Sequence, residues 1–291
     1  MIEQLSTLFT SSPQLFAIAL IPLGLVVGSF LNVVIYRLPV MLERQWRAQA
    51  QDFLDIESPT SDQPTFNLAT PASTCPHCNT AIKAWQNVPV ISYLLLKGQC
   101  AHCSARISAR YPLVELFTAL LTAIVGFHFG FGLYAALAVL LTWCLVTLIF
   151  IDIDHMLLPD NITLPLLWLG LLIALLGWGP VNLKDALVGA MFGYLILWSV
   201  YWAFKLVTGK EGMGYGDFKL LAALGAWLGW QALPMVILIS SVLGAAIGIT
   251  TILFFGGQRS KPIPFGPYLA GAGWVVLIWG NQINQAYLNI Y

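Results

Sequence analysis

Long stretches without a charged side chain dominate this sequence and restrict the folds that it can adopt. They cover 4–36, 116–151, 161–183, 186–204, 220–258 and 262–291. An α-helix needs roughly 20 residues to cross the hydrocarbon core of a bilayer. Of the 291 residues, 58% are hydrophobic and only 9% are charged, whereas a soluble domain carries about 25% charged residues. The sequence therefore predicts an all-α polytopic membrane protein.

The lengths of these stretches predict the number of crossings. Two of them, 116–151 and 220–258, have room for two crossings each, with turns expected at 130–132 and 230–234. Eight transmembrane helices are therefore expected, at about 14–36, 112–130, 132–151, 161–178, 185–206, 219–233, 234–256 and 265–284. The sixth is the shortest, and a re-entrant segment is an alternative there.

Lysine and arginine predict the orientation of the chain. Seven of the 13 lie within 37–111. Five more fall in two loops on the same predicted side: Lys205, Lys210, Lys219, Arg259 and Lys261. Since cytoplasmic loops carry an excess of basic residues, these segments are expected in the cytoplasm. Residues 1–13 lack the basic residues of a removable signal peptide, so the first crossing is expected to be a retained anchor.

This pattern divides the chain into three expected domains. Residues 1–36 form the N-terminal anchor, 37–111 a cytoplasmic insertion after the first crossing, and 112–291 the remaining crossings. Within the insertion, residues 48–74 are rich in Gln, Asp, Ser, Thr and Pro and predict a mobile loop. Membrane lipid is an expected partner. The zero net charge gives no indication of nucleic acid, and none is expected.

Four cysteines predict a metal site in the insertion. They form two Cys-x-x-Cys pairs separated by 21 residues: Cys75, Cys78, Cys100 and Cys103. Four thiolates at this spacing suit tetrahedral zinc in a structural, ribbon-like site, because the closed shell leaves no position for a substrate. Two disulfides or four free thiols are the alternatives, and the reducing cytoplasm disfavours disulfides.

Two acids predict a reactive centre. Asp152 ends an apolar stretch at 145–151, and Asp217 closes the glycine-rich run 212–217. Two expected crossings separate them, so both acids lie on the same side of the membrane. An acid beside lipid-spanning segments carries a desolvation cost and usually has a function. Asp154 is an alternative to Asp152, but the two lie roughly 200° apart around a helix, so only one can face a bundle interior.

The glycines before Asp217 favour a loop that approaches other groups closely. Gly212, Gly214 and Gly216 allow positive φ and remove side-chain obstruction, so a peptide or Asp152 itself can reach Asp217. A flexible membrane turn is the alternative. Two carboxylates a few Å apart do not both ionise easily, so one keeps its proton. The ionised acid can deprotonate a water, and the protonated acid can assist the scissile carbonyl and the leaving amine.

These motifs resemble those of the bacterial type IV prepilin peptidases along nearly the whole chain. The matching segments are 28–39, the two Cys-x-x-Cys pairs, 107–115, 151–155 and 214–217. The resemblance implies an intramembrane aspartyl protease of the GxGD type, with Asp152 and Asp217 as catalytic acids and Gly214 and Gly216 supporting the loop. Asp152 is preferred because the first acid of the family stands seven residues before a proline, here Pro159.

The resemblance also implies the substrates. Such enzymes of the bacterial inner membrane cleave prepilins and type II secretion pseudopilins after a glycine that ends a short basic leader. They then methylate the new N-terminus with S-adenosylmethionine. The family places the methyltransferase activity in the N-terminal cytoplasmic region, which makes Arg37, Glu43, Lys97 and Gly98 candidates for binding the methyl donor.

Two functions from other classes are alternatives. A proton-coupled transporter would also use intramembrane acids, but both acids lie at one face rather than midway, and no pair of broken helices recurs in two halves. A zinc-ribbon scaffold that only docks partners would need the cysteines and neither acid.

Overall fold

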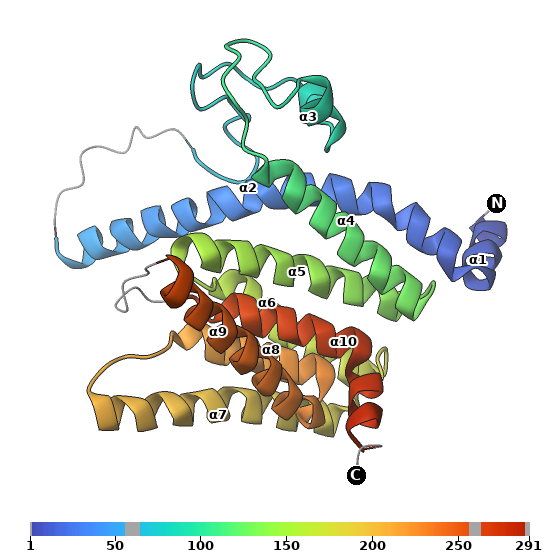
Figure 1. Cartoon of the computed structure of the whole chain (residues 1–291), viewed down its shortest axis with the longest axis vertical. Helices are drawn as coiled ribbons and strands as arrows, with labels where there is room; N and C mark the ends of the chain where they lie inside the picture. Colours follow the sequence, from blue (N-terminus) through green and yellow to red (C-terminus); the bar gives the residue numbers. More distant parts are fainter. Residues whose placement is uncertain (1, 56–64, 256–262, 289–291) are drawn as a thin grey trace. The chain divides into compact units, whose positions relative to one another are not determined.

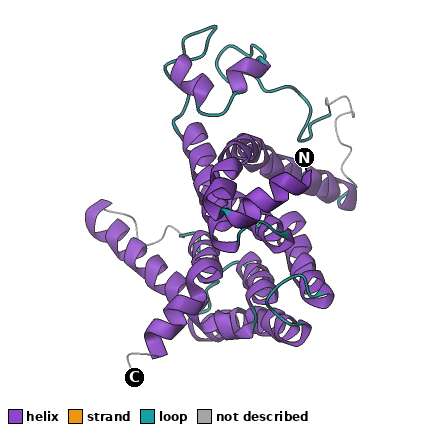
Figure 2. Cartoon of the chain, turned by 90° about the vertical axis from the view of Figure 1, so that its right-hand side faces the viewer, coloured by secondary structure: helices purple, strands orange, loops and turns teal. Residues whose placement is uncertain are grey.

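The structure is a computed structural model that describes residues 2–55, 65–255 and 263–288. Helices joined by loops make up almost all of it (Figures 1 and 2). No strand occurs in these ranges, where β-type pairing is limited to two isolated bridges, Thr74 with Ala81 and Gln99 with Arg106. The all-helical class predicted from the sequence is confirmed. The chain divides into two compact units, the first ending at Ala135 and the second beginning at Ala136.

The first unit is built on one long helix. Helix α2 (Pro13–Phe53) follows the short α1 (Ile2–Ser11) and packs against α4 (Arg110–Phe129). Along the chain, the 3₁₀ turn η1 (Ala84–Asn87) and α3 (Ile91–Leu95) come between α2 and α4. They belong to the loop-rich part of the chain in Figure 2.

Helix α2 does not end near residue 36, where the sequence predicted the end of the first crossing. It continues for more than four turns into the insertion, because residues 41–53 are mostly good helix formers and Glu43 pairs with Arg47 one turn later. The first residues of the predicted 48–74 loop are therefore helical, and residues 56–64 of it lie outside the described residues.

Small residues bring α2 and α4 together. Gly24 and Gly28 lie one turn apart on α2, and a Cβ atom at these positions would come 2.6 Å from the Cα of Ala119 and 2.7 Å from the Cα of Glu115. Glycines spaced by four let helix backbones approach closely, which drives helix association in lipid, where hydrophobic burial gives little.

The second unit surrounds a short central helix. Its elements are α5 (Leu133–His155), α6 (Asp160–Leu176), α7 (Leu183–Thr208), α8 (Tyr215–Leu228), η2 (Trp230–Ala232), α9 (Leu233–Phe255) and α10 (Gly266–Leu288). Helix α8 packs against α6, α7 and α10, and every residue from Leu220 to Trp227 is buried. A helix that is apolar all round belongs inside a bundle.

Helix α8 is also the segment whose span was least certain from the sequence. Its 14 residues rise about 21 Å at 1.5 Å per residue, less than the roughly 30 Å of a hydrocarbon core. Its neighbours hold it through specific contacts. The Trp227 Nε1 donates to the Leu166 carbonyl of α6 at 2.8 Å. On α7, a Cβ at Gly193 would come 2.5 Å from the carbonyl oxygen of Leu221.

Within the described residues, five helices are long and apolar enough to cross a membrane: α2, α4, α5, α7 and the segment Trp230–Thr251, which includes most of α9. Helix α6 is apolar but shorter. On α9, Leu238, Val242 and Ile249 expose large apolar side chains, as expected for a surface in contact with lipid. The membrane class is confirmed, whereas the number of eight crossings stays a prediction.

The contact between α7 and α8 predicts a stability effect. We expect Gly193→Ala to lower the free energy of unfolding by about 1–3 kcal/mol, because the added methyl meets backbone atoms of Leu221 that cannot rotate away. Thermal unfolding in detergent measures the change. Gly271→Ala on α10 is the matched control, since a Cβ there meets nothing within 4 Å. Equal unfolding temperatures for the two variants would contradict the role of this contact.

Candidate active site and metal centre

Asp152 lies in the last turn of α5 and points into the second unit. Its side chain is 5% exposed, whereas Asp154, two residues later, is exposed. The Met156 amide closes the helix by donating to the Asp152 carbonyl at 2.9 Å, and Met156 then takes a positive φ of 50°. The chain turns at this point and brings the buried Leu158 back toward the acid.

Asp217 lies in the first turn of α8. Gly214 caps the helix in an extended conformation, and the Asp217 amide donates to its carbonyl at 3.2 Å. The side chain is 6% exposed. Gly212, Gly214 and Gly216 do not adopt the positive φ that glycine allows. The missing side chain of Gly216 instead lets Leu158 approach the backbone of the loop, since a Cβ at Gly216 would come 2.7 Å from the Cβ of Leu158.

The structure brings the two acids together. The charge of Asp152 acts on Asp217, and the Leu158 side chain contacts the glycine next to Asp217 on one side and Gly266 on the other. Gly266 in turn borders Asp152, because a Cβ at position 266 would come 2.5 Å from Asp152 Oδ2. Leu158 therefore lies between the chain segments that hold the two carboxylates.

The two acids also differ from every other buried polar group in the described ranges. Buried hydroxyls are satisfied within their helices; Thr118 and Thr142, for example, donate to the carbonyls four residues earlier at 2.7 and 2.8 Å. Among buried side-chain oxygens and nitrogens of these residues, only Asp152 Oδ2 and Asp217 Oδ1 have no hydrogen-bond partner. Buried polar atoms without partners are costly and point to a catalytic or binding role.

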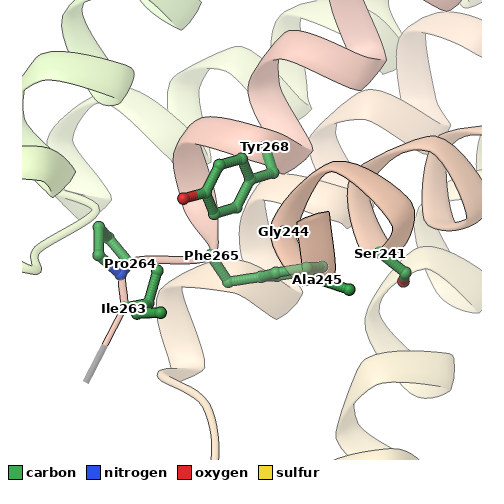
Figure 3. Close-up of a pocket in the computed structure, with 7 residues that line it drawn as sticks. All are labelled: Ser241, Gly244, Ala245, Ile263, Pro264, Phe265 and Tyr268. Atoms are coloured by element: carbon green, nitrogen blue, oxygen red, sulfur yellow. The ribbon is translucent and has the colours of Figure 1, made fainter. Parts of the chain in front are cut away.

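A pocket lies beside the segment that leads into Gly266. Ile263, Pro264 and Phe265 line it together with Tyr268 of α10 and with Ser241, Gly244 and Ala245 of α9 (Figure 3). Its volume is about 300 Å³. Residues 263–265 therefore border the pocket next to α9, while Gly266, the next residue, borders Asp152.

Lys219 adds a polar contact at the edge of the site. It binds both carboxylate oxygens of Asp160 at 2.7 Å and so ties the first turn of α8 to the first turn of α6. Both side chains remain partly exposed, so the pair contributes little to stability and mainly fixes geometry.

The four cysteines of the first unit form one cluster. All four sulfur atoms lie within 4.8 Å of one another, and Cys75 Sγ is 3.8 Å from Cys103 Sγ. Zinc–sulfur bonds of about 2.3 Å in a tetrahedron place the sulfurs about 3.8 Å apart. Four thiols at this spacing fit a transition-metal ion.

Two matching turns build the cluster. The amide of Cys75 donates to the Thr80 carbonyl at 3.0 Å, and the amide of Cys100 donates to the Ala105 carbonyl at 2.8 Å. In each turn, the residue that follows the second cysteine has a positive φ, 55° at Asn79 and 57° at Ser104. Hydrogen bonds from Thr80 lower the pKa of the Cys78 thiol to about 6, which favours the thiolate that binds metals.

The candidates for the methyl donor have other partners. Arg37 is buried and donates to the carbonyls of Asn67 and Pro71 at 2.9 and 2.7 Å. Glu43 accepts from Arg47 at 2.6 Å on the exposed side of α2. Lys97 and Gly98 form the turn before the second cysteine pair, with φ of 52° and 67°.

Sequence reasoning did not assign two further residues. Glu115 of α4 is buried and accepts the Val90 amide at 2.8 Å, which ties the insertion to the helix. Gly266 borders Asp152. The signal at Gly266 was a Pro264-Phe265-Gly266-Pro267 run at the start of an apolar segment, which marks a helix start without revealing its neighbour.

Comparison with known proteins decides the family. A family model described as the bacterial peptidase A24 N-terminal domain matches residues 22–129, and one described as the type IV leader peptidase family matches 139–249. The chain belongs to the type IV leader peptidase family. Both acids lie in the second matched range and all four cysteines in the first. No solved structure was found to match this member of the family.

Curated relatives cover nearly the whole chain. A protein of Aeromonas hydrophila is 59% identical over 276 residues, which are 95% of each chain. One of Pseudomonas aeruginosa is 56% identical over 278 residues, and one of Neisseria gonorrhoeae 46% over 282 residues, each covering at least 95% of both chains. All three carry the name prepilin leader peptidase/N-methyltransferase.

The cysteine cluster predicts bound metal. We expect the purified protein to carry about one transition-metal ion per chain, and Cys75→Ser to lose most of it, because three thiolates hold the ion less tightly than four. Elemental analysis by mass spectrometry measures the metal and identifies it. Cys144→Ser on α5 is the control, since Cys144 lies outside the cluster. A wild-type protein without metal would refute the centre.

Proposed function

We propose that this protein is an intramembrane aspartic endopeptidase that removes the leader of prepilins and then methylates the new N-terminus. The observation that carries the proposal is the pair Asp152 and Asp217, two buried acids with unpartnered oxygens at the ends of helices. The charge of Asp152 acts on Asp217, and a hydrolase can use two neighbouring carboxyl groups to activate one water molecule. The shared name of relatives that are up to 59% identical supports the same activity.

The chemistry needs one proton on the pair. The ionised carboxylate takes a proton from a water molecule as its oxygen attacks the scissile carbonyl, and the protonated carboxyl group donates to the carbonyl oxygen. A gem-diol results. Its collapse breaks the C–N bond: one acid gives its proton to the leaving nitrogen, while the other acid takes a proton from a gem-diol hydroxyl, so the pair returns to its starting protonation state.

The location of the site suits a substrate with a membrane helix. Asp152 ends α5, a helix that is apolar and long enough to cross lipid, so the acid lies where such a helix leaves the bilayer. A prepilin or type II pseudopilin with an apolar helix would present its cleavage junction, after a glycine, at that depth. The basic leader would remain in the cytoplasm for the reason that places the basic loops of this chain there. The inner membrane is the compartment proposed.

Zinc is the metal that we assign to the four cysteines. It would bind Cys75, Cys78, Cys100 and Cys103 and stabilise a segment with few buried apolar residues; it has no open position for substrate. S-adenosylmethionine is the methyl donor that the N-methyltransferase name of the relatives suggests. Arg37, Glu43, Lys97 and Gly98 are the residues that we propose for binding it.

The peptidase proposal predicts the effect of removing either acid. We expect Asp152→Asn and Asp217→Asn each to lower prepilin cleavage by more than about 1,000-fold, because an amide neither takes a proton from water nor returns one. The mass of a purified prepilin before and after incubation measures cleavage.

Asp154→Asn is the matched control for both variants. It removes a carboxylate two residues from Asp152 on an exposed position, so cleavage is expected to continue near the wild-type rate. Methylation of a peptide that already lacks its leader tests whether each variant is folded. Full cleavage by Asp152→Asn or Asp217→Asn would end the assignment.

A further inference from the structure

Gly266 borders Asp152, and it lies beyond the range that the leader peptidase family model matches. It starts α10, whereas Asp152 lies in the last turn of α5. Oδ2 of Asp152 has no hydrogen-bond partner, and a Cβ at position 266 would come 2.5 Å from it. Carbon and oxygen atoms that are not bonded do not approach so closely, so any side chain at position 266 would displace one of the two groups.

The start of α10 also brings a backbone amide to the acid. The amide of Gly266 interacts with the carboxylate of Asp152. Phe265 precedes the helix and accepts the amides of Tyr268 and Leu269 at 3.1 Å, and Pro267 has no N–H. From Gly266 to Leu269, the Gly266 amide is therefore the one that does not donate to the Phe265 carbonyl, and it is available to the carboxylate. Amides at a helix start are well placed to hold a negative charge.

The same arrangement recurs at the other acid. The backbone of Gly214, at the start of α8, interacts with the Asp217 carboxylate. Leu158 lies between the two helix starts: its side chain would be 2.7 Å from a Cβ at Gly216 and 3.1 Å from a Cβ at Gly266. Leu158 is buried, so it cannot move away into solvent.

From these contacts we propose that Gly266 is a positioning residue for Asp152. Its missing side chain provides the space for the carboxylate, and its amide at the start of α10 holds the carboxylate facing Asp217. This inference rests on the proposed peptidase function. It adds to that function a residue on a third helix, far along the sequence from both acids.

A methyl group at position 266 would collide with Asp152 and crowd Leu158, and the two side chains can respond differently. The Asp152 carboxylate is the end of a side chain and can rotate away from position 266. Leu158 needs to move by only a few tenths of an ångström from 3.1 Å. Rotation of Asp152 is therefore the expected response to Gly266→Ala, and it moves the reacting group while the bundle stays folded. A misplacement of about 1 Å costs on the order of 100-fold in rate.

The test is cleavage of a purified prepilin by the full-length protein with Gly266→Ala. We expect kcat to fall about 100-fold with KM within about threefold of the wild type, because the change moves a reacting group and leaves substrate contacts in place. Methylation of a leaderless peptide and the unfolding temperature should stay near wild-type values. Gly271→Ala, five residues along the same helix with open space around its Cβ, should cleave normally.

A second variant separates the Asp152 contact from packing. Leu158→Ala/Gly266→Ala removes the contact with Leu158 and relieves crowding, so it keeps the test valid if the single variant fails to fold. The contact with Asp152 Oδ2 remains. We expect cleavage by the double variant to stay at least about 30-fold below that of Leu158→Ala alone. Recovery to the level of Leu158→Ala would show that Gly266 acts only through packing and would overturn the proposal.

The outcomes distinguish this inference from the function on which it rests. Normal cleavage by Gly266→Ala, with no cleavage by Asp152→Asn, refutes the positioning role and leaves the peptidase intact. Normal cleavage by Asp152→Asn refutes both. Loss of cleavage and of methylation together in Gly266→Ala, if Leu158→Ala/Gly266→Ala restores both, assigns the effect to folding and also refutes the positioning role.

Discussion

The second unit depends on keeping two carboxyl groups within reach of each other's charge inside an apolar bundle. Removing an ionised group from water costs on the order of several kcal/mol, and two like charges add repulsion. A loose bundle would separate Asp152 from Asp217. The dense packing of α8 prevents this, since every residue from Leu220 to Trp227 is buried against neighbouring helices. The packing energy of the helix that carries Asp217 therefore offsets the cost of the acid pair.

Missing side chains make that packing possible. In lipid, helices gain little from hydrophobic burial, so close backbone approach and polar contacts have to hold them together. Gly193 lets α7 meet the carbonyl of Leu221, and Trp227 reaches the Leu166 carbonyl of α6. The same principle applies next to the acids, where Gly216 makes room for Leu158. A bundle of larger residues would be thicker at each of these contacts, and the two acids would lie further apart.

Much of this architecture follows from local sequence patterns. Apolar length predicts where the helices lie, because a helix in lipid satisfies its own backbone and needs no distant partner. The cysteine pairs predict the cluster for a similar reason: each pair lies in one turn, and only the meeting of two turns is non-local. The extension of α2 to Phe53 was missed since the polar composition of 48–53 suits both a loop and an exposed helix. Helix propensity and the Glu43–Arg47 pair decide between them.

Gly266 shows where such patterns stop being informative. The Pro-Phe-Gly-Pro run predicts a helix start, but the function of a glycine that makes room depends on which atom occupies the room. Here that atom is an oxygen of Asp152, 114 positions earlier in the chain. The loop before Asp217 has the same limit, because its glycines allow positive φ and do not adopt it. Glycine is compatible with both unusual torsion angles and close contacts, and only the position of Leu158 shows that close contact is what Gly216 provides.

The two units reach stability by different routes, and the difference has a physical origin. Residues 65–109 contain few buried apolar side chains, so the insertion relies on backbone hydrogen bonds around the cysteines, on Arg37 binding two carbonyls and on Glu115 binding the Val90 amide. A bound metal adds to these contacts directly, because it joins two turns that have little else in common. The second unit has an extensive apolar core and no comparable need. Within the described residues, its unsatisfied buried polar atoms are confined to the two acids, where a water molecule and a peptide bond can supply the missing partners.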